Sequence, residues 1–265
     1  MNLKLLMAAL PFTIACAGLG QESYLISEEQ EISMGAEFHQ QMLEQMPAFQ
    51  GDPKVLQYVK DLGSRIAPHT DRPGLSYTFT VVESDEINAF AVMGGYVYLT
   101  TGLLKSATSG AEVASVLAHE MGHISARHGV RAMETYLVTQ GIVSLIGKND
   151  WSDIVSGALD IGSGLLFSQD QEREADYLGV QYALASQFNP WGMVDFFQYL
   201  QTLEGSSTDG GILTGLGELF STHPPTSERI QSVADQLSSM GIANNSPDLA
   251  WESDISLSEI TKLLK

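Results

Sequence analysis

The sequence predicts an α+β fold that is mainly helical, with a small β-sheet placed directly before one central helix. Three observations predict it. Apolar residues recur at helical spacing over most of the chain. A short stretch between positions 77 and 100 is rich in β-branched and aromatic residues. The 265 residues are 44% hydrophobic and 17% charged, a composition typical of a packed globular protein.

The first twenty residues have the order of a secretory signal peptide. Lys4 precedes an apolar run that ends at Ala15-Cys16-Ala17, a small-x-small pattern, and the run is too short to span a membrane. We therefore expect residues 1–20 to be a signal peptide and residues 21–265 to form a single domain with a short C-terminal extension. In an alternative, the signal is of the lipoprotein type and Cys16, the only cysteine, carries the lipid anchor. Either processing route implies export.

The charge balance limits the possible partners. The formal net charge is −19 and the pI is near 4.4, which argues against nucleic acid and anionic lipid surfaces. The body of the chain after residue 20 contains no hydrophobic stretch able to span a membrane, so we expect no transmembrane segment in the mature chain.

Two helices and three strands are predicted before the central helix. The first helix covers residues 28–46, and the second opens at Asp52-Pro53, an N-cap followed by proline at the first helical position. Strands are predicted at residues 77–82, 88–92 and 96–100, the last two flanking a hairpin-like turn at Met93-Gly94-Gly95. The central helix begins near Ser109-Gly110.

The chain after the central helix is predicted to be helical. Asn189 is expected to cap one of these helices. The predicted helices cover residues 133–146, 154–167, 169–185, 190–203, 226–240 and a short segment from residue 256.

The central helix carries His119-Glu120-Met121-Gly122-His123, the pattern His-Glu-x-x-His. On a helix this spacing places both imidazoles on one face, where they can bind one Zn²⁺. Glu120 is rotated about 100° around the helix from His119 and can act as a general base without binding the metal.

A catalytic zinc takes a third protein ligand and leaves one position open. A third histidine in the extended pattern is absent, since positions 126 and 129 are alanine and glycine. A carboxylate from another helix is therefore expected. Glu172 and Asp176 are four residues apart and share a helical face, which allows Glu172 to bind the metal while Asp176 orients a ligand. Glu174 points away from that face.

These motifs resemble peptidase family M48, a group of gluzincin metallopeptidases. The resemblance rests on His119–His123, Glu172–Asp176, Thr222-His223-Pro224 and Arg229, in this order along the chain. It implies a zincin-like metalloprotease domain with one Zn²⁺ per chain, and Glu172 as the third ligand with Asp176 behind the ligands. His223 corresponds to a histidine that covers the zinc in resting periplasmic members, and Arg229 to an arginine that faces the active site.

The resemblance also implies a substrate-binding strand edge within Asn88–Leu99, with Asn88, Ala89, Phe90 and Ala91 lining the peptide. An extended substrate would pair its backbone with this edge, a mode that gives affinity with little sequence preference. The soluble periplasmic members of the family are the closer match, because the body of the chain contains no membrane-spanning segment.

The predicted function is that of a zinc-dependent metalloendopeptidase of the bacterial cell envelope. Its expected substrates are unfolded or misassembled proteins, in the periplasm, and its possible partners include the envelope assembly machinery. The main alternative is a holdase or assembly factor in which His223 keeps the zinc site closed. A third possibility is a different zinc hydrolase, such as an amidase acting on cell-wall peptides.

Three histidines lie outside these motifs. His128 is expected to make a structural hydrogen bond, because satisfied polar groups outnumber metal ligands. His39 and His69 have no partner in the sequence and are expected at the surface.

Overall fold

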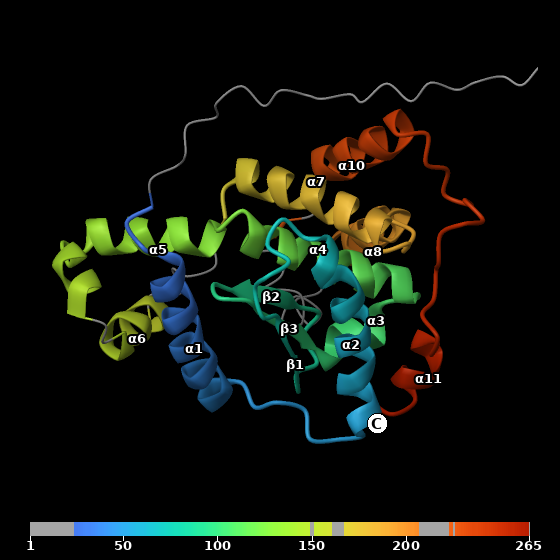
Figure 1. Cartoon of the computed structure of the whole chain (residues 1–265). Helices are drawn as coiled ribbons and strands as arrows, with labels where there is room; N and C mark the ends of the chain where they lie inside the picture. Colours follow the sequence, from blue (N-terminus) through green and yellow to red (C-terminus); the bar gives the residue numbers. More distant parts are fainter. Residues whose placement is uncertain (1–23, 149–150, 161–166, 207–222, 225, 265) are drawn as a thin grey trace, which may run out of the picture.

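The computed structural model describes residues 24–148, 151–160, 167–206, 223–224 and 226–264. The predicted signal peptide, including Cys16, lies outside the described residues. The predicted fold class is confirmed, since the described residues are mainly helical with one small sheet (Figure 1). The elements are α1 (Glu28–Gln45), α2 (Pro53–Ile66), β1 (Thr78–Val82), β2 (Ala89–Val92), β3 (Tyr96–Thr100), α3 (Thr101–Ser106), α4 (Gly110–Ser125), α5 (His128–Thr139), α6 (Ser152–Asp160), α7 (Gln169–Ala185), α8 (Trp191–Ser206), α10 (Ser227–Ser239) and α11 (Leu257–Thr261).

The three strands have the order β1-β3-β2. β1 runs parallel to β3, and β2 pairs antiparallel with β3 through the predicted turn at Met93–Gly95. β2 is therefore an edge strand, and it packs against α4 (Figure 1). β3 is central, so the part of Asn88–Leu99 that belongs to β3 was wrongly expected at an edge: its backbone is already paired on both sides.

Alternate residues of β2 enter two different hydrophobic cores. Ala89 and Ala91 belong to a core shared with α2, α4, α7 and α8. Phe90 and Val92 belong to a second core formed with α1, α5 and α6. Because successive side chains of a strand point to opposite faces, the sheet separates these two cores. The central helix α4 lies on the side of the first core, against the edge strand.

Helix α5 differs from its prediction over residues 133–146. It begins earlier, at His128. Arg127, with a left-handed backbone conformation of φ 56°, separates α4 from α5 and lets the new helix start at the next residue. It ends earlier, at Thr139, because Gly141 has φ 69° and the Ile142 N–H donates back to the Leu137 carbonyl. A 3₁₀ segment, Val143–Lys148, follows.

The other predicted helices agree closely with the structure. Asp52 caps α2, and the Asn189 side chain accepts a hydrogen bond from the Trp191 N–H at 3.1 Å. Of the helix predicted over residues 154–167, α6 covers the first part, and residues 161–166 lie outside the described residues. Among the described helices, we find none with the length and apolar character needed to cross a membrane.

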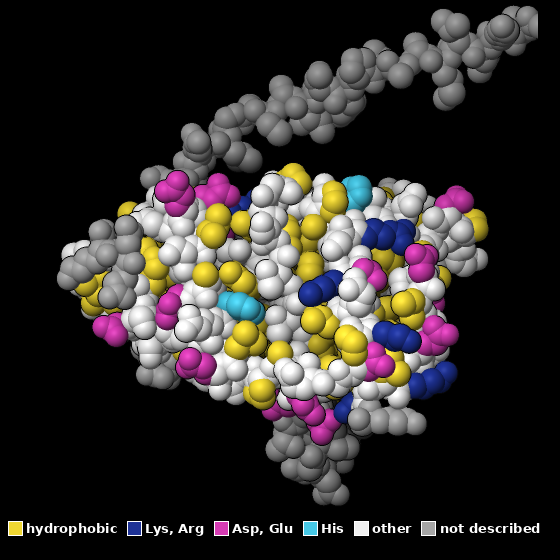
Figure 2. Space-filling view, turned by 60° about the horizontal axis from the view of Figure 1, so that its bottom comes forward, with side chains coloured by type: hydrophobic (Ala, Val, Ile, Leu, Met, Phe, Trp, Pro, Cys, Tyr) yellow, Lys and Arg dark blue, Asp and Glu magenta, His cyan; other side chains and the backbone are white. Residues whose placement is uncertain are grey.

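The surface expectation for His39 was only partly correct. Its ring is half-buried, with Nδ1 2.7 Å from the Tyr98 hydroxyl, and it stacks on Tyr96. His69 is exposed as expected. On the face shown in Figure 2, acidic and basic side chains are interspersed with hydrophobic ones.

Candidate metal centre

Two glycines allow α4 and α7 to approach closely. A Cβ atom at Gly122 would lie 3.0 Å from the Ala175 carbonyl oxygen, and one at Gly179 would lie 3.0 Å from the backbone nitrogen of His119. Glycine inside a helix costs about 1 kcal/mol relative to alanine, so its presence at both positions indicates a packing requirement. This role was not predicted from the sequence, although a glycine inside a predicted helix is a recognisable signal. The close contact turns the acidic face of α7 toward His119.

Four buried side chains place donor atoms in one cluster, with all donors within 4.8 Å of one another: His119, His123, Glu172 and His223. The Nε2 atoms of His119 and His123 are 3.1 Å apart, and three other donor pairs are 3.3 to 3.5 Å apart. The shortest pair joins His223 Nδ1 to Glu172 Oε1 at 2.8 Å. Tetrahedral ligands at about 2.0–2.1 Å from one ion would be roughly 3.3 Å from each other. Three imidazoles and one carboxylate are also a donor set that suits zinc. The residues present therefore fit a single Zn²⁺.

The electrostatics of the cluster favour a cation. Burial alone would lower the pKa of His119, but hydrogen bonding and charge from Asp176 and Glu172 raise it to about 10. Burial lowers the pKa of His123 well below its usual value. For Glu172, burial opposes ionisation, but hydrogen bonds from the three clustered histidines hold its pKa below the usual range. The carboxylate is ionised and His119 carries a proton that a metal would displace.

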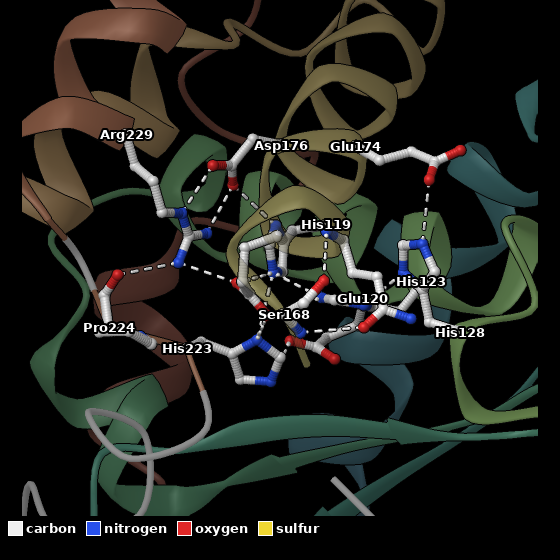
Figure 3. A network of polar contacts seen from close by, with 12 residues as sticks. His119, Glu120, His123, His128, Ser168, Glu174, Asp176, His223, Pro224 and Arg229 are labelled. Carbon is white, nitrogen blue, oxygen red and sulfur yellow. Dashed lines mark hydrogen bonds and ion pairs between the residues drawn. The ribbon is translucent and has the colours of Figure 1, made fainter. Parts of the chain in front are cut away.

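Asp176 and Arg229 support the His119 side of the cluster (Figure 3). Asp176 Oδ1 lies 2.9 Å from His119 Nδ1. Arg229 donates to both oxygens of Asp176, through Nε at 2.7 Å and Nη2 at 2.6 Å. Its Nη1 donates to the Pro224 carbonyl at 3.0 Å and forms an ion pair with Glu172 Oε2 at 2.8 Å. In this conformation the guanidinium therefore joins α7, α10 and the loop that carries His223.

The ionisation of this buried pair follows from its contacts. Burial would raise the pKa of Asp176, but Arg229 and His119 lower it. Burial would lower the pKa of Arg229, but Asp176 raises it. Both side chains are charged, and each is at most 4% exposed.

Glu120 lies beside the donor cluster but outside it. The residue is 1% exposed, and its Oε2 atom has no hydrogen-bond partner among the residues that the structure describes. Its Oε1 atom is 3.8 Å from His223 Nε2. A buried carboxylate oxygen without a partner is costly in a folded protein, and such atoms occur where function requires a free acceptor.

An apolar pocket adjoins His119 and Glu120. Its other walls come mainly from α4 and α8, with Val116, Met193, Phe196, Phe197 and Leu200. This pocket could not be predicted from the sequence, because its walls come from helices that are far apart in the chain.

Only part of the predicted substrate edge reaches the donor cluster. The side chains of Asn88, Ala89, Phe90 and Ala91 are all buried. Ala91 lines a smaller hollow of about 220 Å³ together with His123 and Phe167, whose ring stacks on His123 with centroids 4.1 Å apart. The end of β2 near Ala91 is thus the part of the edge that adjoins the candidate metal ligands.

His128 makes the hydrogen bond that the sequence predicted, and its partner is a candidate metal ligand. Its Nδ1 atom is 2.8 Å from Nδ1 of His123, and its Nε2 atom is 3.2 Å from Glu174 Oε2. Burial lowers the pKa of His128, which favours the neutral ring. The identity of this partner could not be predicted, because the contact depends on the left-handed turn at Arg127.

A His-Glu-x-x-His helix packed against a helix with a Glu-x-x-x-Asp motif, in a small α+β fold with a converging donor cluster, defines a metallopeptidase. Comparison with known proteins identifies the group. The pattern of Peptidase family M48 matches residues 53–237, and the chain belongs to this family.

Relatives of this chain include several proteases. It is 31% identical over 230 residues to the beta-barrel assembly-enhancing protease of Yersinia pestis, covering 81% of this chain and 45% of the relative. It is 26% identical over 196 residues to metalloprotease YcaL of Escherichia coli (strain K12), covering 70% of each chain. Metalloprotease LoiP of the same organism is 28% identical over 179 residues, covering 64% of this chain and 66% of LoiP. The chain thus spans a little under half the length of the beta-barrel assembly-enhancing protease.

Proposed function

We propose that this protein is a zinc-dependent metalloendopeptidase of the bacterial cell envelope that hydrolyses unfolded or misassembled proteins. The observation that carries the proposal is the unpartnered, buried carboxylate oxygen of Glu120 beside a cluster of four metal-binding side chains. His119, His123 and Glu172 are the proposed ligands of Zn²⁺. Membership of a metallopeptidase family supports this reading of the cluster.

In the proposed reaction, water adds to the scissile carbonyl carbon and the C–N bond then breaks. The bound ion supplies Lewis acidity for this addition. Glu120 accepts the proton of the attacking water and delivers it to the leaving amine, which matches a free acceptor at Oε2. His223 or Arg229 donates a hydrogen bond to the developing oxyanion once the loop that carries His223 moves.

His223 gives the site a resting state in this proposal. Its Nδ1 atom is 2.8 Å from Glu172 Oε1 and 3.4 Å from His119 Nε2, inside the donor cluster. A catalytic zinc needs one position free for water, and His223 would occupy a fourth position on an ion held by His119, His123 and Glu172. Movement of the His223 side chain out of the cluster would therefore be part of activation.

The surroundings of the cluster support an extended polypeptide as substrate. Edge strand β2 offers backbone groups for pairing, and the apolar pocket beside His119 and Glu120 suits an apolar side chain next to the cleaved bond. Unfolded proteins expose the backbone groups and apolar side chains that would fit this strand and pocket, whereas folded proteins bury most of them. Similarity to a beta-barrel assembly-enhancing protease supports a periplasmic location and the envelope assembly machinery as a partner.

Cleavage of an unfolded test protein by wild type and by Glu120→Gln tests the proposal, with zinc quantified in both. Glutamine keeps the size of the side chain but cannot accept the proton, so we expect equal zinc and a loss of cleavage on the order of 10³-fold. Wild-type turnover in the variant would contradict the role of Glu120. Full zinc without cleavage by wild type would favour the holdase alternative, unless His223→Ala restores cleavage by opening the site.

A further inference from the structure

The turn between α4 and α5 directs one histidine back toward the donor cluster. α4 ends at Ser125 and α5 begins at His128. Between them Arg127 has φ 56° and ψ 34°, a conformation that is strained for any residue other than glycine. Two hydrogen bonds hold it there: Nε donates to Glu31 Oε2 at 2.9 Å, and Nη2 donates to the Ile26 carbonyl at 2.9 Å. The strained turn is therefore fixed by α1 and by Ile26 just before it, outside the metal centre.

This turn brings two imidazole rings into buried contact. His128 is 0% exposed, and its Nδ1 atom lies 2.8 Å from Nδ1 of His123. On the other side of the His123 ring, Nε2 faces His119 Nε2 at 3.1 Å, inside the donor cluster. His123 can bind a metal through Nε2 only if its proton sits on Nδ1. That N–H then donates to Nδ1 of His128.

This assignment also fixes the proton of His128. Because its Nδ1 atom accepts from His123, its own proton lies on Nε2, which is 3.2 Å from Glu174 Oε2. The chain His123–His128–Glu174 then has a donor and an acceptor at every contact, with no proton left over. Figure 3 shows these residues on the opposite side of the cluster from Asp176 and Arg229.

We infer that His128 is a positioning residue for the metal ligand His123, with Glu174 orienting His128 in turn. The inference rests on the proposed metal site. His128 would hold the His123 ring in the tautomer and orientation that present Nε2 to the ion. Partners of this kind raise the basicity of a ligand and fix its direction, and their loss weakens metal affinity by about 10–100-fold.

The alternative is that His128 only fills space under His123, and two substitutions separate the two roles. His128→Leu keeps a buried apolar group of similar size but removes the acceptor. His128→Asn is smaller, but its amide oxygen takes the place of Nδ1 and can still accept from His123. A space-filling role predicts that asparagine is the worse substitution, and a positioning role predicts the reverse.

The readout is the dissociation constant for Zn²⁺, measured on the metal-free full chain by competition with a chromogenic chelator. We expect His128→Leu to weaken binding by about 10–100-fold and His128→Asn by less than about 3-fold. Glu174→Gln should weaken it by about 2–5-fold, because Glu174 is half-exposed and its charge is partly screened. His69→Leu and Asp170→Asn, two exposed positions, serve as controls and should leave the affinity unchanged. The Co²⁺ absorption spectrum should shift in His128→Leu but not in the controls.

Wild-type affinity in His128→Leu would overturn the inference, as would an equal loss in His128→Asn and His128→Leu. Circular dichroism shows whether the leucine variant folds. If it does not, His128→Ala replaces it as the variant without an acceptor. The inference then requires that His128→Asn bind Zn²⁺ more tightly than His128→Ala, and that Glu174→Gln weaken zinc binding. Failure of wild type itself to bind zinc would instead contradict the proposed function.

Discussion

The two candidate histidine ligands on α4 are supported in different ways. Behind His119 lies a buried, fully charged pair, Asp176 and Arg229, whose four polar contacts link α7, α10 and the His223 loop. Behind His123 lies a neutral ring, His128, whose own partner Glu174 is 49% exposed. The Asp176–Arg229 pair is buried from solvent, whereas the hydrogen-bond chain behind His123 ends at a half-exposed carboxylate.

This difference separates a rigid side of the metal centre from an adjustable one. A buried ion pair that loses one partner leaves an uncompensated charge, so the Asp176–Arg229 side tolerates little change. A neutral hydrogen bond contributes less, and an exposed carboxylate is screened by salt. The free energy of unfolding should therefore depend mainly on the contacts behind His119. The contacts behind His123 should mainly change the affinity for the metal.

The largest expected effect is on folding stability. Asp176→Ala leaves Arg229 buried with only Glu172 to balance it, so we expect a loss of about 3–5 kcal/mol in the free energy of unfolding. His128→Ala should cost only about 1–3 kcal/mol, because it leaves one buried imidazole N–H without an acceptor. Urea unfolding of the metal-free proteins measures both. Equal losses would remove the distinction between the two supports.

A second test changes the helix contact that places both supports. In Gly179→Ala the new Cβ atom would lie 3.0 Å from the backbone nitrogen of His119, so α7 must move away from α4. We expect a loss of about 1–3 kcal/mol in the free energy of unfolding, together with weaker zinc binding. Gly74→Ala is the matched control, since its Cβ atom meets nothing within 4 Å. Identical behaviour of the two variants would mean that the close approach of α4 and α7 is not required.

A third test uses the different protonation of the two histidines. His119 has a pKa of about 10 and carries a proton at pH 7, whereas the pKa of His123 is lowered and its ring is neutral. Zinc binding at pH 7 should therefore release about one proton, and zinc affinity should fall as the pH falls. Calorimetry in buffers of different ionisation enthalpy measures this release. Asp176→Asn should reduce it, because the pKa of His119 then falls, and His128→Asn should not.

The sequence predicted the elements better than their contacts. His119, Glu120, His123 and Glu172 follow from helical spacing and from resemblance to a family, and the structure brings them together with His223. The strand edge was only half right, because β3 is the central strand and, of the two strands within Asn88–Leu99, only β2 lies at an edge of the sheet. Helix periodicity identifies buried faces but not which faces meet, so the sequence could not predict the pairing of His128 with His123.

The most direct test of the metal centre is an anomalous difference map at the zinc absorption edge from crystals of the zinc-loaded protein. We expect one peak per chain, about 2.0–2.1 Å from Nε2 of His119 and of His123 and about 2.0–2.2 Å from a carboxylate oxygen of Glu172. In that structure Glu120 should lie near the peak without binding it. A peak at any other group of residues, or one that lacks Glu172, would contradict the assignment of the site.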